Sequence, residues 1–147
     1  MKPFVWLIAC WCVLLSGCAI ADSVRQPRPM RIECATKSKL DRFELLKAAL
    51  ENNAFKLTGE DYEKGTLTAA RFPSPVFLGD QVLFQGGLHL VGEVDAVSIT
   101  LYLYKAMNAD KENPKLEVSY DEKNAPLYVR PFFQQLLIDL RKGCSEK

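Results

Sequence analysis

The segment from residue 96 to residue 104, AVSITLYLY, constrains the fold more than any other part of this chain. Its side chains alternate, with apolar residues at one parity (Val97, Ile99, Leu101 and Leu103) and hydroxyl-bearing residues at the other. Such alternation predicts a β-strand with one buried face and one wetter face. Residues 116–120 alternate in the same way beyond a polar loop, and we expect them to form the antiparallel partner.

Shorter strands are expected elsewhere in the chain. Residues 31–36 predict a first strand with Ile32 and Cys34 on one face. Residues 55–58 and 66–71 flank a charged turn and predict a hairpin. A proline-punctuated loop, RFPSPVFLGD, then leads to a strand over residues 81–85 that Gly86 and Gly87 end.

Two amphipathic helices complete the pattern. Ser38, with Asp41 three residues later, predicts a capping box at the start of a helix that Asn52 and Asn53 end. Pro131 suits the first turn of a second helix, whose apolar stripe we expect Gly143 to end. This stripe comprises Phe133, Leu136, Leu137 and Leu140. The order of elements predicts an α+β two-layer sandwich, in which two helices pack on one face of an antiparallel sheet.

The first residues of the chain predict export. Lys2 is followed by an unbroken apolar stretch from Phe4 to Leu15, which has the length of the hydrophobic region of a signal peptide. The next residues complete the sequence Leu15-Ser16-Gly17-Cys18. The small residues Ser16 and Gly17 suit a cleavage region after the apolar stretch, so this part of the chain predicts secretion.

This four-residue sequence resembles the lipobox of bacterial lipoproteins. The resemblance implies removal of residues 1–17, diacylglyceryl and acyl (palmitate-type) modification of Cys18, and attachment to a membrane. Two or three acyl chains are what stable anchoring requires. Because Ala19, not aspartate, follows the modified cysteine, the resemblance points to the outer membrane of the bacterial cell envelope, facing the periplasm. Residues 18–31 would form the lipidated terminus and tether, and residues 32–147 a single α+β domain.

Two alternatives stay open for the leader. The stretch from Pro3 to Ala21 has about the length of a short membrane span and could serve as an uncleaved anchor. An ordinary secretory signal could instead be cut near Ala19 or Ala21.

Cysteine usage then predicts a disulfide. Cys10 and Cys12 lie inside the leader, and Cys18 would carry lipid. Cys34 and Cys144 are left, and such a pair in an exported protein most often forms a bridge. The bridge would join the start of the domain to the end of its last helix.

Composition and motifs argue against several functions. After removal of the leader, 18 basic residues face 18 acidic ones without a basic stripe, which does not favour nucleic-acid binding. The usual motifs of hydrolases, metalloproteases and nucleotide-binding enzymes do not occur. His89 is the only histidine, and two sulfurs with one histidine do not complete a zinc site. We therefore expect no catalysis, no metal and no cofactor.

The candidate contact residues are apolar or aromatic. Most of them fall in the proline-punctuated loop, where the first expectation is that the loop packs back onto its own sheet. A docking edge for a partner or lipid is the alternative. The candidates are Phe72, Val76, Phe77, Leu78, Tyr102 and Tyr104.

Two functional hypotheses follow. The first is a non-enzymatic envelope lipoprotein that binds another envelope component, most simply a protein, as an accessory module. The order of elements resembles, in outline, the helix-grip domains of outer-membrane assembly lipoproteins. The second is a small-molecule or lipid-binding module with a cavity lined by Ile99, Leu101 and Phe133. A hydrolase ranks third.

Overall fold

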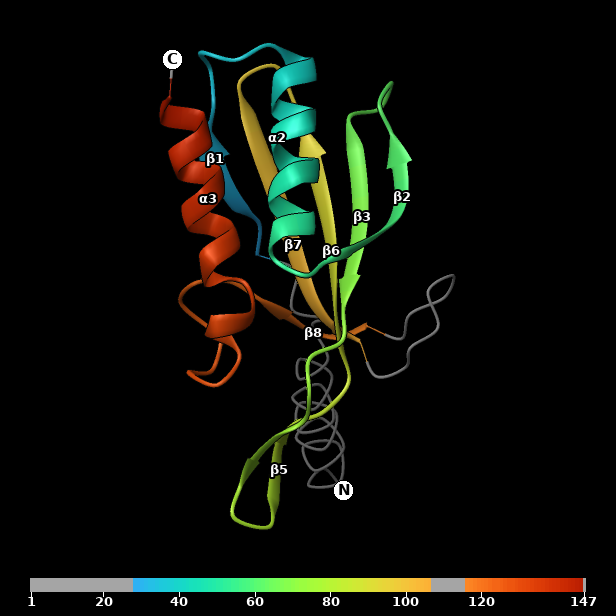
Figure 1. The fold of residues 1–147 in the computed structure, drawn as a ribbon, viewed down its shortest axis with the longest axis vertical. Coiled ribbons are helices and arrows are strands. Elements are labelled where there is room, and N and C mark those ends of the chain that lie inside the picture. Colours follow the sequence, from blue (N-terminus) through green and yellow to red (C-terminus); the bar gives the residue numbers. More distant parts are fainter. Residues whose placement is uncertain (1–27, 107–115, 147) are drawn as a thin grey trace, which may run out of the picture.

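The computed structural model describes residues 28–106 and 116–146, and they form an antiparallel sheet covered on one face by two helices (Figure 1). The leader, the lipobox and most of the tether lie outside the described residues. The elements are β1 (Met30–Glu33), α2 (Lys39–Asn52), β2 (Lys56–Asp61), β3 (Thr66–Arg71), β4 (Val76–Leu78), β5 (Gln81–Phe84), β6 (Gly87–Val94), β7 (Ser98–Ala106), β8 (Leu116–Tyr120), the 3-10 turn η1 (Arg130–Phe132) and α3 (Gln134–Ser145). The expected α+β two-layer sandwich is confirmed.

The main sheet has the order β1-β7-β6-β3-β2, and every described pairing is antiparallel. Strand β7 is long enough to carry two partners on its outer edge. β1 pairs with Ser98–Leu101, and β8 pairs with Leu103–Ala106. The predicted pairing of residues 116–120 with the alternating strand is therefore confirmed.

The core lies between the sheet and the helices. From β7 it takes Ile99, Leu101 and Leu103, which have no exposed surface. Leu46 and Leu50 of α2 and Leu136 and Leu140 of α3 face them and are equally buried. Val97, which shares their parity, is instead 42% exposed, because the strand begins at Ser98 and Val97 belongs to the preceding turn. Alternation predicted the buried face but not where the strand starts.

Helix α2 starts as the sequence indicates. Ser38 Oγ accepts a hydrogen bond from the Asp41 amide at 3.1 Å, and the Asp41 carboxylate accepts one from the Ser38 amide at 3.3 Å. This reciprocal capping box satisfies two amides that the first turn leaves without helical partners. Asn53 ends the helix, as expected.

The prediction for the last helix is wrong at both ends. Pro131 lies in η1, and α3 begins only at Gln134. Gly143 does not end α3, which continues to Ser145. A methyl group at position 143 would overlap Leu45 Cδ1 of α2, so this glycine allows close approach of the two helices. Tertiary packing overrides the usual role of glycine as a helix terminator.

A whole strand was also missed. Gly86 and Gly87 do follow β5, but Gly87 then begins β6, which pairs with both β3 and β7 and lies in the middle of the sheet. The segment GLHLVGEV alternates, with Leu88, Leu90 and Val94 buried. Its two glycines hid that pattern, because glycine within a strand weakens the signal.

Candidate functional site

The proline-punctuated segment is a hairpin rather than a loop. Strands β4 and β5 pair only with each other and form a second, two-stranded sheet that extends away from the main one (Figure 1). Phe77 lies opposite Val82, and Leu78 lies opposite Gln81. Gly79 has φ of 58° in the connecting turn, a conformation that favours glycine.

The tip of this hairpin exposes large apolar side chains. Leu78 is 66% exposed, Phe77 57% and Val82 52%. The expectation that the segment packs back onto its own sheet is therefore wrong at the tip. It holds at the base, where Val76 packs partly against the core and Phe84 is only 2% exposed.

Aromatic and cationic contacts hold the base of the hairpin. The Phe84 ring centroid lies 5.6 Å from that of Phe132 in η1, and Lys105 Nζ lies 5.8 Å from the Phe84 centroid. Arg71, at the end of β3, donates from Nη1 to the Phe132 carbonyl at 2.6 Å and to the Asn53 carbonyl at 3.1 Å. The base is thus fastened to β7, η1 and the end of α2, which orients the tip relative to the domain.

The structure divides the six candidate contact residues into two groups. Phe72, Val76, Phe77 and Leu78 come together on the hairpin and the segment that leads into it. Tyr102 and Tyr104 lie elsewhere, at the β7 parity opposite to the buried one and therefore on the sheet face away from the helices. Both tyrosines are half-buried, and burial raises the pKa of the Tyr104 hydroxyl.

His89 belongs to the tyrosine face. It lies in β6 directly opposite Tyr104 on one side and Ala70 on the other. Burial lowers the pKa of its imidazole, so His89 is neutral at pH 7. A histidine held between a tyrosine and an alanine in a regular sheet has the setting of a structural residue.

Metal-ligating side chains do not gather anywhere in the part of the chain that the structure describes. Within residues 28–106 and 116–146, no group of three or more histidine, cysteine, aspartate or glutamate side chains is placed to hold an ion. Asp61 and Asp121 instead accept hydrogen bonds from the backbone amides of their own turns. These carboxylates stabilise local chain reversals.

The three residues named for a cavity between sheet and helices have different settings in the structure. Ile99 and Leu101 are fully buried in the core, and neither borders either of the two surface cavities described below. Phe133 borders a surface cavity of about 110 Å³ at the start of α3, with Glu122, Arg130, Gln134 and Leu137. A shallower hollow of about 370 Å³ is lined mainly by charged residues between the start of β1 and the end of β8.

The predicted disulfide is present and closes the far end of the domain. Cys34 and Cys144 are bridged, with Cα atoms 4.8 Å apart, and this joins the end of β1 to the end of α3. Arg42 of α2, only 3% exposed, donates from Nη1 to the Cys34 carbonyl at 3.1 Å and also to the Lys37 carbonyl. Its Nε has no hydrogen-bond partner among the described residues.

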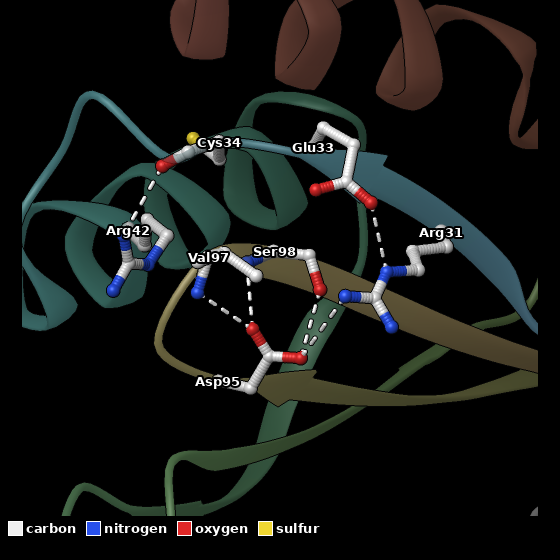
Figure 2. A network of polar contacts seen from close by, with 7 residues as sticks. All are labelled: Arg31, Glu33, Cys34, Arg42, Asp95, Val97 and Ser98. Carbon is white, nitrogen blue, oxygen red and sulfur yellow. Dashed lines mark hydrogen bonds and ion pairs between the residues drawn. The ribbon is translucent and has the colours of Figure 1, made fainter.

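A polar turn lies beside Cys34, one of the two cysteines of the disulfide (Figure 2). The Asp95 carboxylate accepts hydrogen bonds from the amides of Val97 at 2.8 Å and Ser98 at 2.7 Å, and from Ser98 Oγ at 2.9 Å. The Val97 carbonyl in turn accepts from the Cys34 amide at 2.7 Å. The hydrogen bonds of this turn thus fix the β6–β7 connection against the end of β1.

Sequence reasoning missed two features of the site. Val82 was placed correctly in a strand, but nothing local showed that this strand leaves the main sheet. Asp95 carried a local signal that could have predicted its role. An aspartate side chain readily accepts hydrogen bonds from the backbone amides two and three residues later, here those of Val97 and Ser98, and this arrangement forms an Asx turn.

Comparison with protein-family models, with curated proteins and with solved structures finds no match to this chain. Among the described residues, no helix combines the length and the apolar character needed to cross a bilayer.

Proposed function

We propose that this protein is a lipid-anchored, non-enzymatic module of the bacterial cell envelope, attached through Cys18, that docks onto another envelope component through the β4–β5 hairpin. The observation that carries the docking is the exposure of Phe77, Leu78 and Val82 on a projection whose base is fixed. Exposed apolar side chains gathered on one projecting element mark an interaction site more often than an ordinary surface.

The anchoring part of the proposal is supported by sequence. Leu15-Ser16-Gly17-Cys18 matches the lipobox at every position, and Ala19 favours the outer membrane. The disulfide between Cys34 and Cys144 accords with an oxidising compartment such as the periplasm. The binding role is supported by what the described residues contain: a closely packed core and an apolar projection.

The anchoring is tested by replacing Cys18. Wild type and Cys18→Ser are expressed in a Gram-negative host and labelled with radioactive palmitate, and the membranes are then fractionated. We expect label and outer-membrane residence for wild type and the loss of both for the variant. Palmitate incorporation that persists in Cys18→Ser would contradict lipid attachment at this thiol.

The docking is tested by photocrosslinking in intact cells. A photoreactive residue at Phe77 should give crosslinked products, and the same residue at Tyr62 serves as the matched control. Tyr62 is aromatic and 46% exposed but lies in the β2–β3 turn, at the end of the sheet away from the hairpin. Equal crosslinking from both positions, or none from Phe77, would contradict docking through the hairpin.

A further inference from the structure

We propose that the component contacted by the hairpin is the bilayer surface itself, the same membrane that holds the lipid anchor. This inference rests on the proposed attachment through Cys18. The protein would then touch the membrane at two points, the acylated terminus and the side of the β4–β5 hairpin that carries Phe77 and Val82.

The exposed apolar residues are concentrated at one end of the molecule. The hairpin end is where Gly87 pairs with Ala106 and where η1 packs. Of the eleven exposed large hydrophobic residues in the described ranges, seven lie on the elements of this end. The exposed apolar surface is therefore distributed unevenly over the domain. These seven are Phe72, Phe77, Leu78, Val82, Leu116, Val118 and Leu127.

The chain enters the domain from the same side. Strand β1 starts with Met30 opposite Leu101 and runs toward Glu33 opposite Ser98, away from the Gly87–Ala106 pair. Figure 1 shows β1 in blue, with its start directed toward the part of the molecule from which the hairpin projects. The described chain therefore enters β1 at the end of the strand that lies toward the hairpin.

The lengths of tether and hairpin match. The chain from Cys18 to Met30 spans about 40 Å if fully extended. The rise from the level of Leu101 to the Gly79 turn, along β6 and then the hairpin, is at most about 40 Å, the value for a hairpin that continues the line of β6. A relaxed tether has an end-to-end distance of only about 20 Å. An upright hairpin would therefore require a nearly fully extended tether, which costs chain entropy. A hairpin that tilts and lays one side on the surface is compatible with a relaxed tether, so the tilted arrangement is favoured.

The composition of the hairpin suits this contact. Asp80 is its only ionisable residue between Phe72 and Gln85, so few charges lose water when it meets lipid. Phe77 and Val82 are cross-strand partners and hence share a face. With that face down, the side chains enter the boundary between headgroups and acyl chains, while the Asp80 carboxylate in the turn can stay at headgroup level.

Tryptophan fluorescence provides a direct test. Both tryptophans of the chain, Trp6 and Trp11, precede Cys18 and are absent from the processed protein. Phe77→Trp therefore introduces a single fluorophore at the hairpin, and Tyr62→Trp introduces one at the opposite end as a matched control. Each full-length lipidated variant is reconstituted into phosphatidylethanolamine–phosphatidylglycerol vesicles with or without acyl-brominated lipid, and flotation and the mass of the terminus are recorded.

We expect brominated lipid to quench Phe77→Trp by about twofold or more and to leave Tyr62→Trp unchanged, because only the first fluorophore reaches acyl-chain depth. If Phe77→Trp floats with the vesicles but is not quenched, the bilayer is not the occupant, although the anchor stands. Crosslinks from Phe77 to a protein, together with absent quenching, would keep the proposed docking and overturn this inference. A protein that carries no acyl mass and does not float would overturn the anchoring and this inference with it.

Discussion

The packed domain and the β4–β5 hairpin use the same kinds of residue in opposite ways. Leu101 lies in the core with no exposed surface, whereas Leu78 in the hairpin is 66% exposed. The core is closed by two helices and by the Cys34–Cys144 bridge, while the hairpin is fastened only at its base. The contrast separates residues that make the fold from residues that the fold presents to something else.

Loss of the disulfide should have the largest effect. We expect Cys34→Ser/Cys144→Ser to lower the free energy of unfolding by about 4 kcal/mol, because a bridge across a sequence separation of 110 residues strongly restricts the unfolded chain. Urea unfolding followed by circular dichroism measures the change. A reductant should destabilise wild type to the same extent and leave the variant unaffected; a much smaller loss would mean that the core closes without the bridge.

A large-to-small change in the core should come next. Leu101→Ala is expected to cost about 3 kcal/mol, since it removes a fully buried side chain and leaves a cavity between β7 and the helices. Urea unfolding measures this change too. If the dependence of the free energy of unfolding on urea concentration (the m value) is the same as in wild type, the substitution has changed only the stability. A cost below about 1 kcal/mol would show that the site collapses easily and that the core is less closely packed than described.

The Asp95 turn should contribute less and should depend on pH. The pKa of Asp95 is lowered first by the Val97 amide, then by the Ser98 hydroxyl and amide and by nearby Arg31. The pKa of Asp95 is lower in the folded state than in the unfolded state. The ionised carboxylate therefore contributes fully to the free energy of unfolding at pH values above the ordinary aspartate pKa, and this contribution is lost as the pH falls through the folded-state pKa. We expect Asp95→Asn to cost about 1 kcal/mol at pH 7.

The difference in free energy of unfolding between wild type and Asp95→Asn should become smaller as the pH is lowered from the ordinary aspartate pKa through the folded-state pKa of Asp95. Asp80→Asn, in the exposed hairpin turn, is the matched control and should leave stability unchanged at pH 7. A difference in free energy of unfolding that does not change with pH would show that the charge of Asp95 does not stabilise the turn.

The smallest effect is expected in the hairpin. Leu78→Ala should change the free energy of unfolding by no more than about 0.5 kcal/mol, because the side chain is already largely in water. Leu78→Ala and Leu101→Ala are the same substitution at an exposed and at a buried position, so the two costs in free energy of unfolding can be compared directly. A cost near that of Leu101→Ala would erase the distinction between core and projection and would weaken the case for docking.

Local patterns were enough to predict several parts of the site and fold. The Ser38–Asp41 capping box and the alternation of Ile99, Leu101 and Leu103 involve residues close in sequence, and both are confirmed. The bridge between Cys34 and Cys144 followed from counting the cysteines that an exported chain would retain. Leader processing and lipid attachment at Cys18 stay predictions.

Other features depended on contacts between residues far apart in sequence. Gly143 continues α3 because Leu45 of another helix packs against it, and Gly87 begins β6 because β3 and β7 supply hydrogen-bonding partners on both sides. The exposure of Phe77 could not be read locally either, since an apolar strand has the same sequence whether it joins the main sheet or leaves it.

The sequence by itself determined the α+β class, the buried face of β7, the start of α2 and the pairing of the two cysteines, because each depends on short-range periodicity, capping or counting. Only the tertiary structure decided that β6 forms the middle of the sheet, that Gly143 lies inside a helix and that the hairpin presents Phe77, Leu78 and Val82 to the surroundings. The physical reason is that burial and strand pairing are set by partners distant in the chain, whose positions no local pattern records.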